Sequence, residues 1–197
     1  MNAVCDRLLV GVCGSIGLFD HLFWLAGLGL AREVRVIVTP AATAIVKPQV
    51  VRRLVDCTLW TDPWEEIEGV RVPHADLPRW ADVFVVMPAT ANTIASAAHG
   101  RADNLLTLAI LSSTSPVGFV PCMSADMWQA PATRRNVGTL RGDGHEVLDP
   151  GAGAGFAVSV SGAEQPAASS LDAASVRRFV ARLATGLRPA PAEAAGV

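Results

Sequence analysis

Short, uninterrupted apolar runs recur along the chain, and each predicts a strand that is buried on both faces of a sheet. The clearest runs are residues 7–13, 82–87 and 117–120. Residues 33–38 also predict a strand, because they are β-branched and flanked by polar residues, and residues 146–148 predict a final short strand. Pro88 and Pro121 directly follow two of these runs, and we expect the prolines to end the strands. Strands without polar alternation are typical of a parallel sheet whose two faces are covered by helices.

The segments between these runs carry apolar residues at helical spacing, as Leu18, Leu22 and Leu25 do. They predict helices over residues 18–31, 41–46, 48–55, 91–98, 104–112, 123–140 (in pieces) and 171–187, the last with Ser170 as its N-cap. Residues 60–80 hold three tryptophans and three prolines, so we predict mostly loop there, with a short strand near residues 70–72.

Strands that alternate with helices predict an α/β fold, a Rossmann-like doubly wound parallel sheet in a three-layer sandwich. The length predicts one domain over residues 1–187, and the Pro- and Ala-rich residues 188–197 predict a disordered tail. Residues 149–162, rich in Gly, Ala and Ser, predict a mobile hairpin that serves as a substrate flap. Ligands of such sheets bind beyond the carboxyl ends of the strands, so loops 13–17, 39–43, 88–93 and 121–128 are the candidate site.

Composition removes several classes of protein from consideration. The 16 basic and 18 acidic residues nearly cancel, which argues against a nucleic-acid binder or a polybasic membrane binder. No Gly-Lys-Ser/Thr sequence is present, so the chain has no P-loop. The four cysteines are scattered without a CxxC pair, which predicts no zinc site and favours a reducing, cytoplasmic location. No apolar stretch reaches the ~18 residues of a transmembrane helix.

The turn Gly14-Ser15-Ile16 follows the first strand and opens a helix, where free backbone N–H groups and a hydroxyl make an anion site. A plain strand-to-helix turn is the alternative interpretation. The sequence lacks the full GxGxxG spacing, and Thr39 rather than an acidic residue ends the second strand, with Thr43 one helical turn later. These hydroxyls suit one terminal phosphate, so a mononucleotide fits better than NAD.

Two further loops carry specific sequences. In residues 88–93, PATANT, Asn92 offers both a donor and an acceptor for the edge of a flavin or purine. Helix capping by Thr90 is the alternative interpretation of this loop. In residues 121–128, PCMSADMW, the two methionines and the tryptophan suit either a binding surface or the core.

Together these two loops resemble the PASANT and PxMNxxMW motifs of the homo-oligomeric flavin-containing cysteine decarboxylases. The resemblance covers about residues 7 to 165 and extends to Gly14-Ser15-Ile16, His74, Trp80-Ala-Asp82 and Ala102-Asp-Asn-Leu105. It implies a flavodoxin-like flavoprotein that binds FMN at a subunit interface, in a trimer or a dodecamer of trimers. The family contains peptidyl-cysteine decarboxylases of lanthipeptide-like biosynthesis and the related phosphopantothenoylcysteine decarboxylases.

The resemblance also implies a role for individual residues. His74 matches the catalytic base, whereas His21, His99 and His145 are expected to be structural. The implied cofactor-binding residues are Gly14, Ser15, Ile16, Thr39 and Thr43 toward the phosphate and Ala89, Thr90, Asn92, Thr93, Cys122 and Met123 around the ring. The implied substrate-binding residues are Ser124, Met127 and Trp128. Ser124 departs from the family, which has an asparagine there to hold the substrate carboxylate.

The two branches of the family differ in their product. The coenzyme A enzymes use a later cysteine to reduce an enethiol, but no cysteine follows Cys122 here. We therefore expect FMN-dependent oxidative decarboxylation of the C-terminal cysteine of a ribosomal precursor peptide, giving an enethiol for an aminovinyl-cysteine-type ring. Phosphopantothenoylcysteine decarboxylase, a non-catalytic FMN-binding regulatory subunit and, with less support, a flavin prenyltransferase remain as alternatives.

Overall fold

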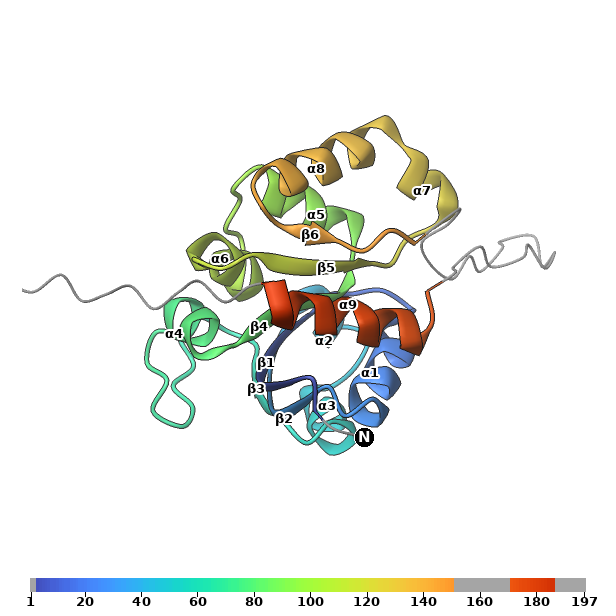
Figure 1. Cartoon of the computed structure of the whole chain (residues 1–197). Helices are drawn as coiled ribbons and strands as arrows, with labels where there is room; N and C mark the ends of the chain where they lie inside the picture. Colours follow the sequence, from blue (N-terminus) through green and yellow to red (C-terminus); the bar gives the residue numbers. More distant parts are fainter. Residues whose placement is uncertain (1–2, 151–170, 187–197) are drawn as a thin grey trace, which may run out of the picture.

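The sheet is six-stranded and entirely parallel in a computed structural model that describes residues 3–150 and 171–186. Its strands are β1 Cys5–Val12, β2 Ala31–Val38, β3 Thr58–Trp60, β4 Val83–Ala89, β5 Val117–Pro121 and β6 Glu146–Val147. The spatial order is β3-β2-β1-β4-β5-β6, which is the Rossmann order (Figure 1). The predicted fold class is confirmed.

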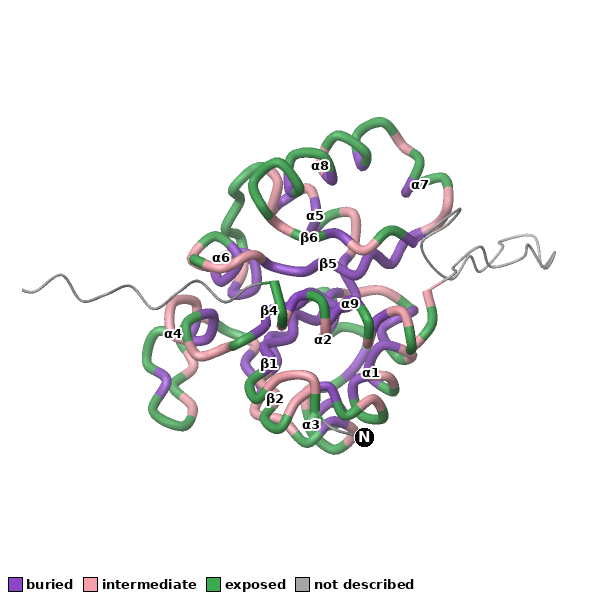
Figure 2. Tube along the Cα trace, in the orientation of Figure 1, coloured by how far each residue is buried: buried purple, intermediate pink, exposed green. Residues whose placement is uncertain are grey.

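Helices cover both faces of this sheet. They are α1 Leu18–Gly27, α2 Pro40–Thr43, α3 Pro48–Leu54, α4 Pro73–Trp80, α5 Ala91–Ala98, α6 Leu105–Ser112, α7 Ala125–Gln129, α8 Pro131–Gly142 and α9 Ala173–Gly186. Apolar side chains of α1, α2, α3 and α9 pack on one face, and those of α4 to α8 pack on the other. Figure 2 shows the result, with buried strands at the centre and helices that expose only their outer sides.

Strand β4 forms the middle of the core, because all seven of its residues are buried. Val83 and Val85 face the layer of α1 and α9, whereas Phe84 and Val86 face the layer of α5 and α6. Contiguous burial of this kind is why the apolar runs without alternation predicted the strands correctly.

Several local predictions are wrong in detail. β4 continues through Pro88 to Ala89, with an irregular register to β5 between Val86 and Ala89, and β5 includes Pro121. The first helix ends at Gly27, and Gly29 then takes φ +55°, a conformation that a helix does not contain. Residues 73–80 form α4 rather than loop, and the strand expected near residues 70–72 is only an isolated bridge between Ile67 and Val70.

Three predictions fall wholly or largely on residues outside the described part of the chain. They are the flap at residues 149–162, the tail at 188–197 and the N-cap at Ser170. Near the start of α9, the carboxylate of Asp172 accepts a hydrogen bond from the Ser175 N–H at 2.7 Å, which is an N-cap interaction. Within residues 3–150 and 171–186, no helix has both the length and the apolarity to cross a bilayer.

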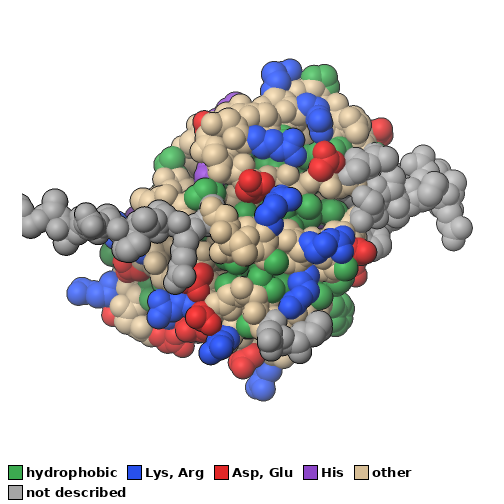
Figure 3. Space-filling model, viewed as in Figure 1, with side chains coloured by type: hydrophobic (Ala, Val, Ile, Leu, Met, Phe, Trp, Pro, Cys, Tyr) green, Lys and Arg blue, Asp and Glu red, His purple; other side chains and the backbone are tan. Residues whose placement is uncertain are grey.

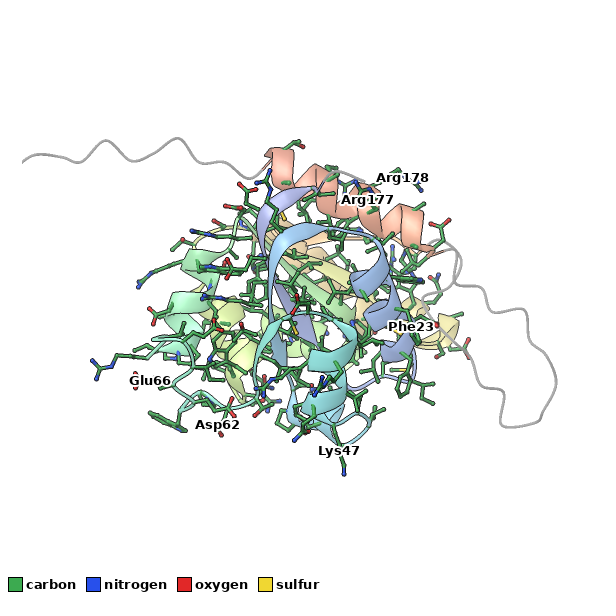
Figure 4. All side chains as sticks on the ribbon, turned by 90° about the horizontal axis from the view of Figure 1, so that it is seen from below. Phe23, Lys47, Asp62, Glu66, Arg177 and Arg178 are labelled. Atoms are coloured by element: carbon green, nitrogen blue, oxygen red, sulfur yellow. The ribbon has the colours of Figure 1, made fainter. Side chains whose placement is uncertain are left out.

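Charged side chains of both signs are mixed on the face of the molecule that carries α9 (Figure 3). In Figure 3 the basic side chains on the face of α8 and α9 are spread among polar and acidic ones. Arg177 and Arg178 of α9 lie on the side of the molecule away from Asp62 and Glu66, which project from the loop before α4 (Figure 4). On the face shown in Figure 3, acidic and basic side chains are thus mixed, in keeping with the near-neutral composition.

A candidate cofactor cleft at the strand ends

An open cleft of about 610 Å³ lies at the carboxyl edge of the sheet. It adjoins the point where the chain leaves β1 toward one helical layer and leaves β4 toward the other, which is where ligands bind in doubly wound sheets. Its lining comes from all four predicted loops and from the start of α6: Cys13, Gly14, Ser15, Thr39, Pro40, Ala41, Thr90, Ala91, Asn92, Thr93, Asp103, Asn104, Cys122, Met123 and Met127. The volume lies in the range of small-molecule sites.

Helix N-termini surround this cleft. Thr39, Thr90 and Asn104 cap α2, α5 and α6 with their side chains, whereas α1 begins at Gly17 without a side-chain cap. Among the described residues, neither Lys nor Arg lines the cleft, and its one charged group, Asp103, is paired with Arg101 at 2.7 Å. An anion would therefore be held by backbone N–H groups, hydroxyls and helix dipoles.

Gly14 is required by the close approach of two turns. A Cβ at this position would lie 2.6 Å from the Ala41 carbonyl carbon and 2.7 Å from its oxygen. Because these are backbone atoms, they cannot rotate away as a side-chain end can. The turn after β1 thus packs directly against the start of α2, and the cleft depends on the missing side chain.

The hydroxyls and thiols of the cleft are hydrogen-bonded to the backbone or to one another. Thr39 Oγ1 donates to the Val12 carbonyl at 3.2 Å and accepts from the Ala42 N–H at 3.3 Å, so its proton is already engaged. The thiol of Cys13 lies 3.1 Å from Thr93 Oγ1, which lies 3.2 Å from Thr90 Oγ1.

A second thiol–hydroxyl pair crosses the cleft, with Ser15 Oγ 3.1 Å from Cys122 Sγ. Burial raises the pKa of the Cys13 thiol to about 11 and also raises the pKa of Cys122, so both thiols are protonated at neutral pH. Asn92 is exposed on the rim of the cleft.

The structure brings together nine of the predicted site residues: Gly14, Ser15, Thr39, Thr90, Asn92, Thr93, Cys122, Met123 and Met127. Six others do not line the cleft of a single chain: Ile16, Thr43, His74, Ala89, Ser124 and Trp128. Ile16 points away with 65% exposure, and the Thr43 hydroxyl donates to the Pro40 carbonyl at 2.8 Å. Ala89 is fully buried in the core.

The two substrate-binding candidates next to Met127 are engaged in local structure. Ser124 caps α7, because its hydroxyl accepts from the Met127 N–H at 3.3 Å. Trp128 is 1% exposed and lies beneath the guanidinium of Arg134, 5.3 Å from the ring centre. These positions give both residues a structural role in holding α7 beside the cleft.

His74 is half-buried as the second residue of α4. This helix contains Pro78, which has no N–H to donate to the His74 carbonyl four residues earlier. The first turn of α4, which carries His74, therefore lacks one backbone hydrogen bond. The imidazole does not line the cleft of its own chain.

Six cleft residues were not named individually as site residues. Cys13, Pro40, Ala41 and Ala91 lie in the predicted loops, whereas Asp103 and Asn104 lie in the segment 102–105 that matches the family. The last two precede α6, which follows another helix, so the rule of searching after strands did not reach them. The signal that identifies them is the capping pair of Asn104 and Thr107, in which each side chain bonds the other's backbone N–H.

The chain matches one protein family model and is similar to several known proteins. The family model called Flavoprotein matches residues 2–174. Mersacidin decarboxylase of Bacillus sp. strain HIL-Y85/54728 is 33% identical over 147 residues, 73% of each chain. The crystal structure of the FMN-dependent cysteine decarboxylase SpaF has a TM-score of 0.70 at 34% identity, and the match covers 91% of this chain and 97% of SpaF.

The coenzyme A biosynthesis bifunctional protein CoaBC of Bacillus subtilis strain 168 is 38% identical over 148 residues. The match covers 75% of this chain but 36% of CoaBC. The chain thus spans about a third of the length of this relative.

Proposed function

This chain belongs to the Flavoprotein family, and from that premise we propose that it binds FMN and oxidatively decarboxylates the C-terminal cysteine of a precursor peptide. The observation that carries the proposal is the meeting of two distant loops, 88–93 and 121–128, in one cleft at the switch point of the sheet. Mersacidin decarboxylase and SpaF, both similar to this chain, are named as decarboxylases, and SpaF as FMN-dependent.

The cleft residues fit a flavin mononucleotide. Its phosphate would lie at Gly14 and Ser15, against the uncapped start of α1. Backbone N–H groups would hold it there, because no lysine or arginine of residues 3–150 and 171–186 lines the cleft. The ring would lie between Asn92, which has donor and acceptor capacity for its polar edge, and Met123, whose side chain offers an apolar contact.

The chemistry explains why a decarboxylase of this kind needs such a cofactor. Bound FMN supplies the acceptor for a hydride from the cysteine Cβ. The substrate then carries a C=S group, and its carboxylate is β to that group, so the electrons released with CO₂ have a place to go. The protein must position the thiol, remove its proton and hold the carboxylate until it leaves; His74 is the proposed base.

The position of His74 has a consequence for assembly. Because it does not line the cleft of its own chain, we propose that it acts on the cleft of a second copy. A homo-oligomer, a trimer or a dodecamer of trimers, is therefore part of the proposal.

The choice of a peptide substrate depends on the cysteines. Residues 123–197 contain none, so the chain has no later thiol to reduce the enethiol, and the proposed reaction stops at the unsaturated product. Phosphopantothenoylcysteine is the second candidate substrate, because the identity to CoaBC, 38%, exceeds that to mersacidin decarboxylase, 33%.

The experiment incubates FMN-loaded protein with synthetic peptides ending in cysteine, with matched peptides ending in serine, and with phosphopantothenoylcysteine. We expect the cysteine peptides alone to lose CO₂ and two hydrogens by mass spectrometry. Conversion of phosphopantothenoylcysteine instead assigns the chain to the coenzyme A branch. If FMN binds but no cysteine substrate bleaches it under anaerobic conditions, the chain is a non-catalytic flavoprotein and the proposal fails.

His74 is tested by two variants that are each expected to be inactive. His74→Asn should keep bound flavin and lose turnover, and Gly14→Val should lose the flavin. If His74 serves a neighbouring cleft, random mixing of the two chains should restore activity at about a quarter of the sites. Normal turnover of His74→Asn removes this residue from the mechanism, and no recovery on mixing argues that it serves its own chain.

A further inference from the structure

Cys122 is the cleft residue whose role is least explained by the proposed function. Its backbone N–H donates to the Ala89 carbonyl at 2.9 Å, which fixes it at the end of β4. Its sulfur lies 3.1 Å from Ser15 Oγ, so the contact joins the turn after β1 to the loop after β5. Cys122 therefore contacts Ser15, the residue whose hydroxyl would donate to a phosphate.

Either atom of this contact can be the donor. A bound phosphate would favour one direction, because the serine hydroxyl donates more strongly to an anion than to a neutral sulfur. The thiol is neutral, because burial raises its pKa, and so retains a proton to donate. A thiol that donates to Ser15 Oγ leaves the serine's own O–H free to point into the cleft.

Thr39, which also lines the cleft, has no free hydroxyl proton. Thr39 Oγ1 donates to the Val12 carbonyl and is thereby withdrawn from an incoming anion. Lysine and arginine are absent from the lining among the described residues. The orientation of the Ser15 hydroxyl should therefore have a large effect on how well a phosphate is held.

We propose that Cys122 is a positioning residue that orients the Ser15 hydroxyl toward the phosphate of the cofactor and so sets the preference for the phosphorylated flavin. This inference rests on the proposed function, because it assumes that FMN occupies the cleft. It concerns binding rather than turnover, and it is measured on the protein without substrate.

The test titrates flavin-free protein with FMN and with riboflavin, which lacks the phosphate, and follows flavin fluorescence. Cys122→Ala should weaken FMN binding about tenfold, as expected when a charge-assisted hydrogen bond is impaired. Its affinity for riboflavin should change less than about twofold. Cys122→Ser keeps a donor and should recover most of the FMN affinity. Cys57→Ala, which removes a half-buried thiol outside the cleft, is the matched control.

A double-mutant cycle separates orientation from packing. In a Ser15→Ala background, Cys122→Ala should cause no further loss of FMN affinity, because the hydroxyl that it orients is gone. This comparison holds even if each variant is somewhat less stable.

Three outcomes overturn the inference: unchanged FMN affinity in Cys122→Ala, equal losses for FMN and riboflavin, or no recovery in Cys122→Ser. If the unmodified protein binds neither flavin, the proposed function itself fails.

Discussion

Replacing Gly14 by alanine tests whether the turn after β1 and the start of α2 form one rigid cofactor cradle. The added Cβ would lie 2.6 Å from the Ala41 carbonyl carbon. Ordinary contact between carbon atoms begins near 3.5 Å, so the two turns must separate by roughly 0.9 Å. That displacement exceeds the range of about 0.5 Å over which the donor–acceptor distance of an N–H···O hydrogen bond normally varies.

Two quantities should change in this variant. The free energy of unfolding of the flavin-free protein should fall by about 1–3 kcal/mol, the usual cost of overpacking. FMN affinity should fall at least tenfold, because losing one hydrogen bond to a charged group costs about 1.5–3 kcal/mol. Urea unfolding measures the first quantity, and titration by flavin fluorescence measures the second.

Gly138→Ala is the matched control. Gly138 lies inside α8, and an added Cβ there meets no atom within 4 Å. This change should leave FMN binding alone and stabilise the protein by about 0.5–1 kcal/mol, since alanine favours a helix interior. If Gly14→Ala binds FMN as tightly as the unmodified protein does, the turn is not part of the phosphate site and the reasoning is refuted.

Two further predictions concern stability. Burial lowers the pKa of His21, so the neutral imidazole should stabilise the fold fully above the unfolded-state pKa near 6.5, and this stabilisation should be lost as the pH falls. In urea unfolding, the free energy of unfolding should therefore fall less between pH 7.5 and 5.5 in His21→Leu than in the unmodified protein. An equal fall in both proteins would contradict this assignment. Asn104→Ala removes the side-chain half of the α6 capping pair with Thr107 and should cost about 1 kcal/mol in the flavin-free protein; thermal unfolding checks it, and an unchanged midpoint would show that water replaces the cap.

The sequence predicted those parts of the fold whose signal is local and repeated. Apolar runs marked β1, β4 and β5, because strands buried on both sides need no polar positions. β2 was marked by its β-branched residues, and its first half is only partly buried. It failed at α4, where Pro73 and Pro78 suggested breaks. Pro73 occupies the first turn, where its missing N–H costs nothing, and the tertiary contacts of Leu77 in the core hold the rest of the helix.

The site was predictable to the level of loops but not of side-chain direction. The rule that ligands bind beyond strand ends selected loops that line one cleft. Neighbouring residues of those loops nevertheless point in different directions. Ala89 and Trp128 are packed into the core, while Met123 and Met127 line the cleft. That difference is decided by packing between elements far apart in the chain, which no local pattern contains.

The outermost strands, β3 with three residues and β6 with two, leave the sheet with very short open margins. A margin of this length exposes few unpaired backbone groups, so a foreign strand would gain little by adding to it. Among the described residues, the two sheet edges therefore offer little template for edge-to-edge pairing, and a second copy would meet mainly helices and loops.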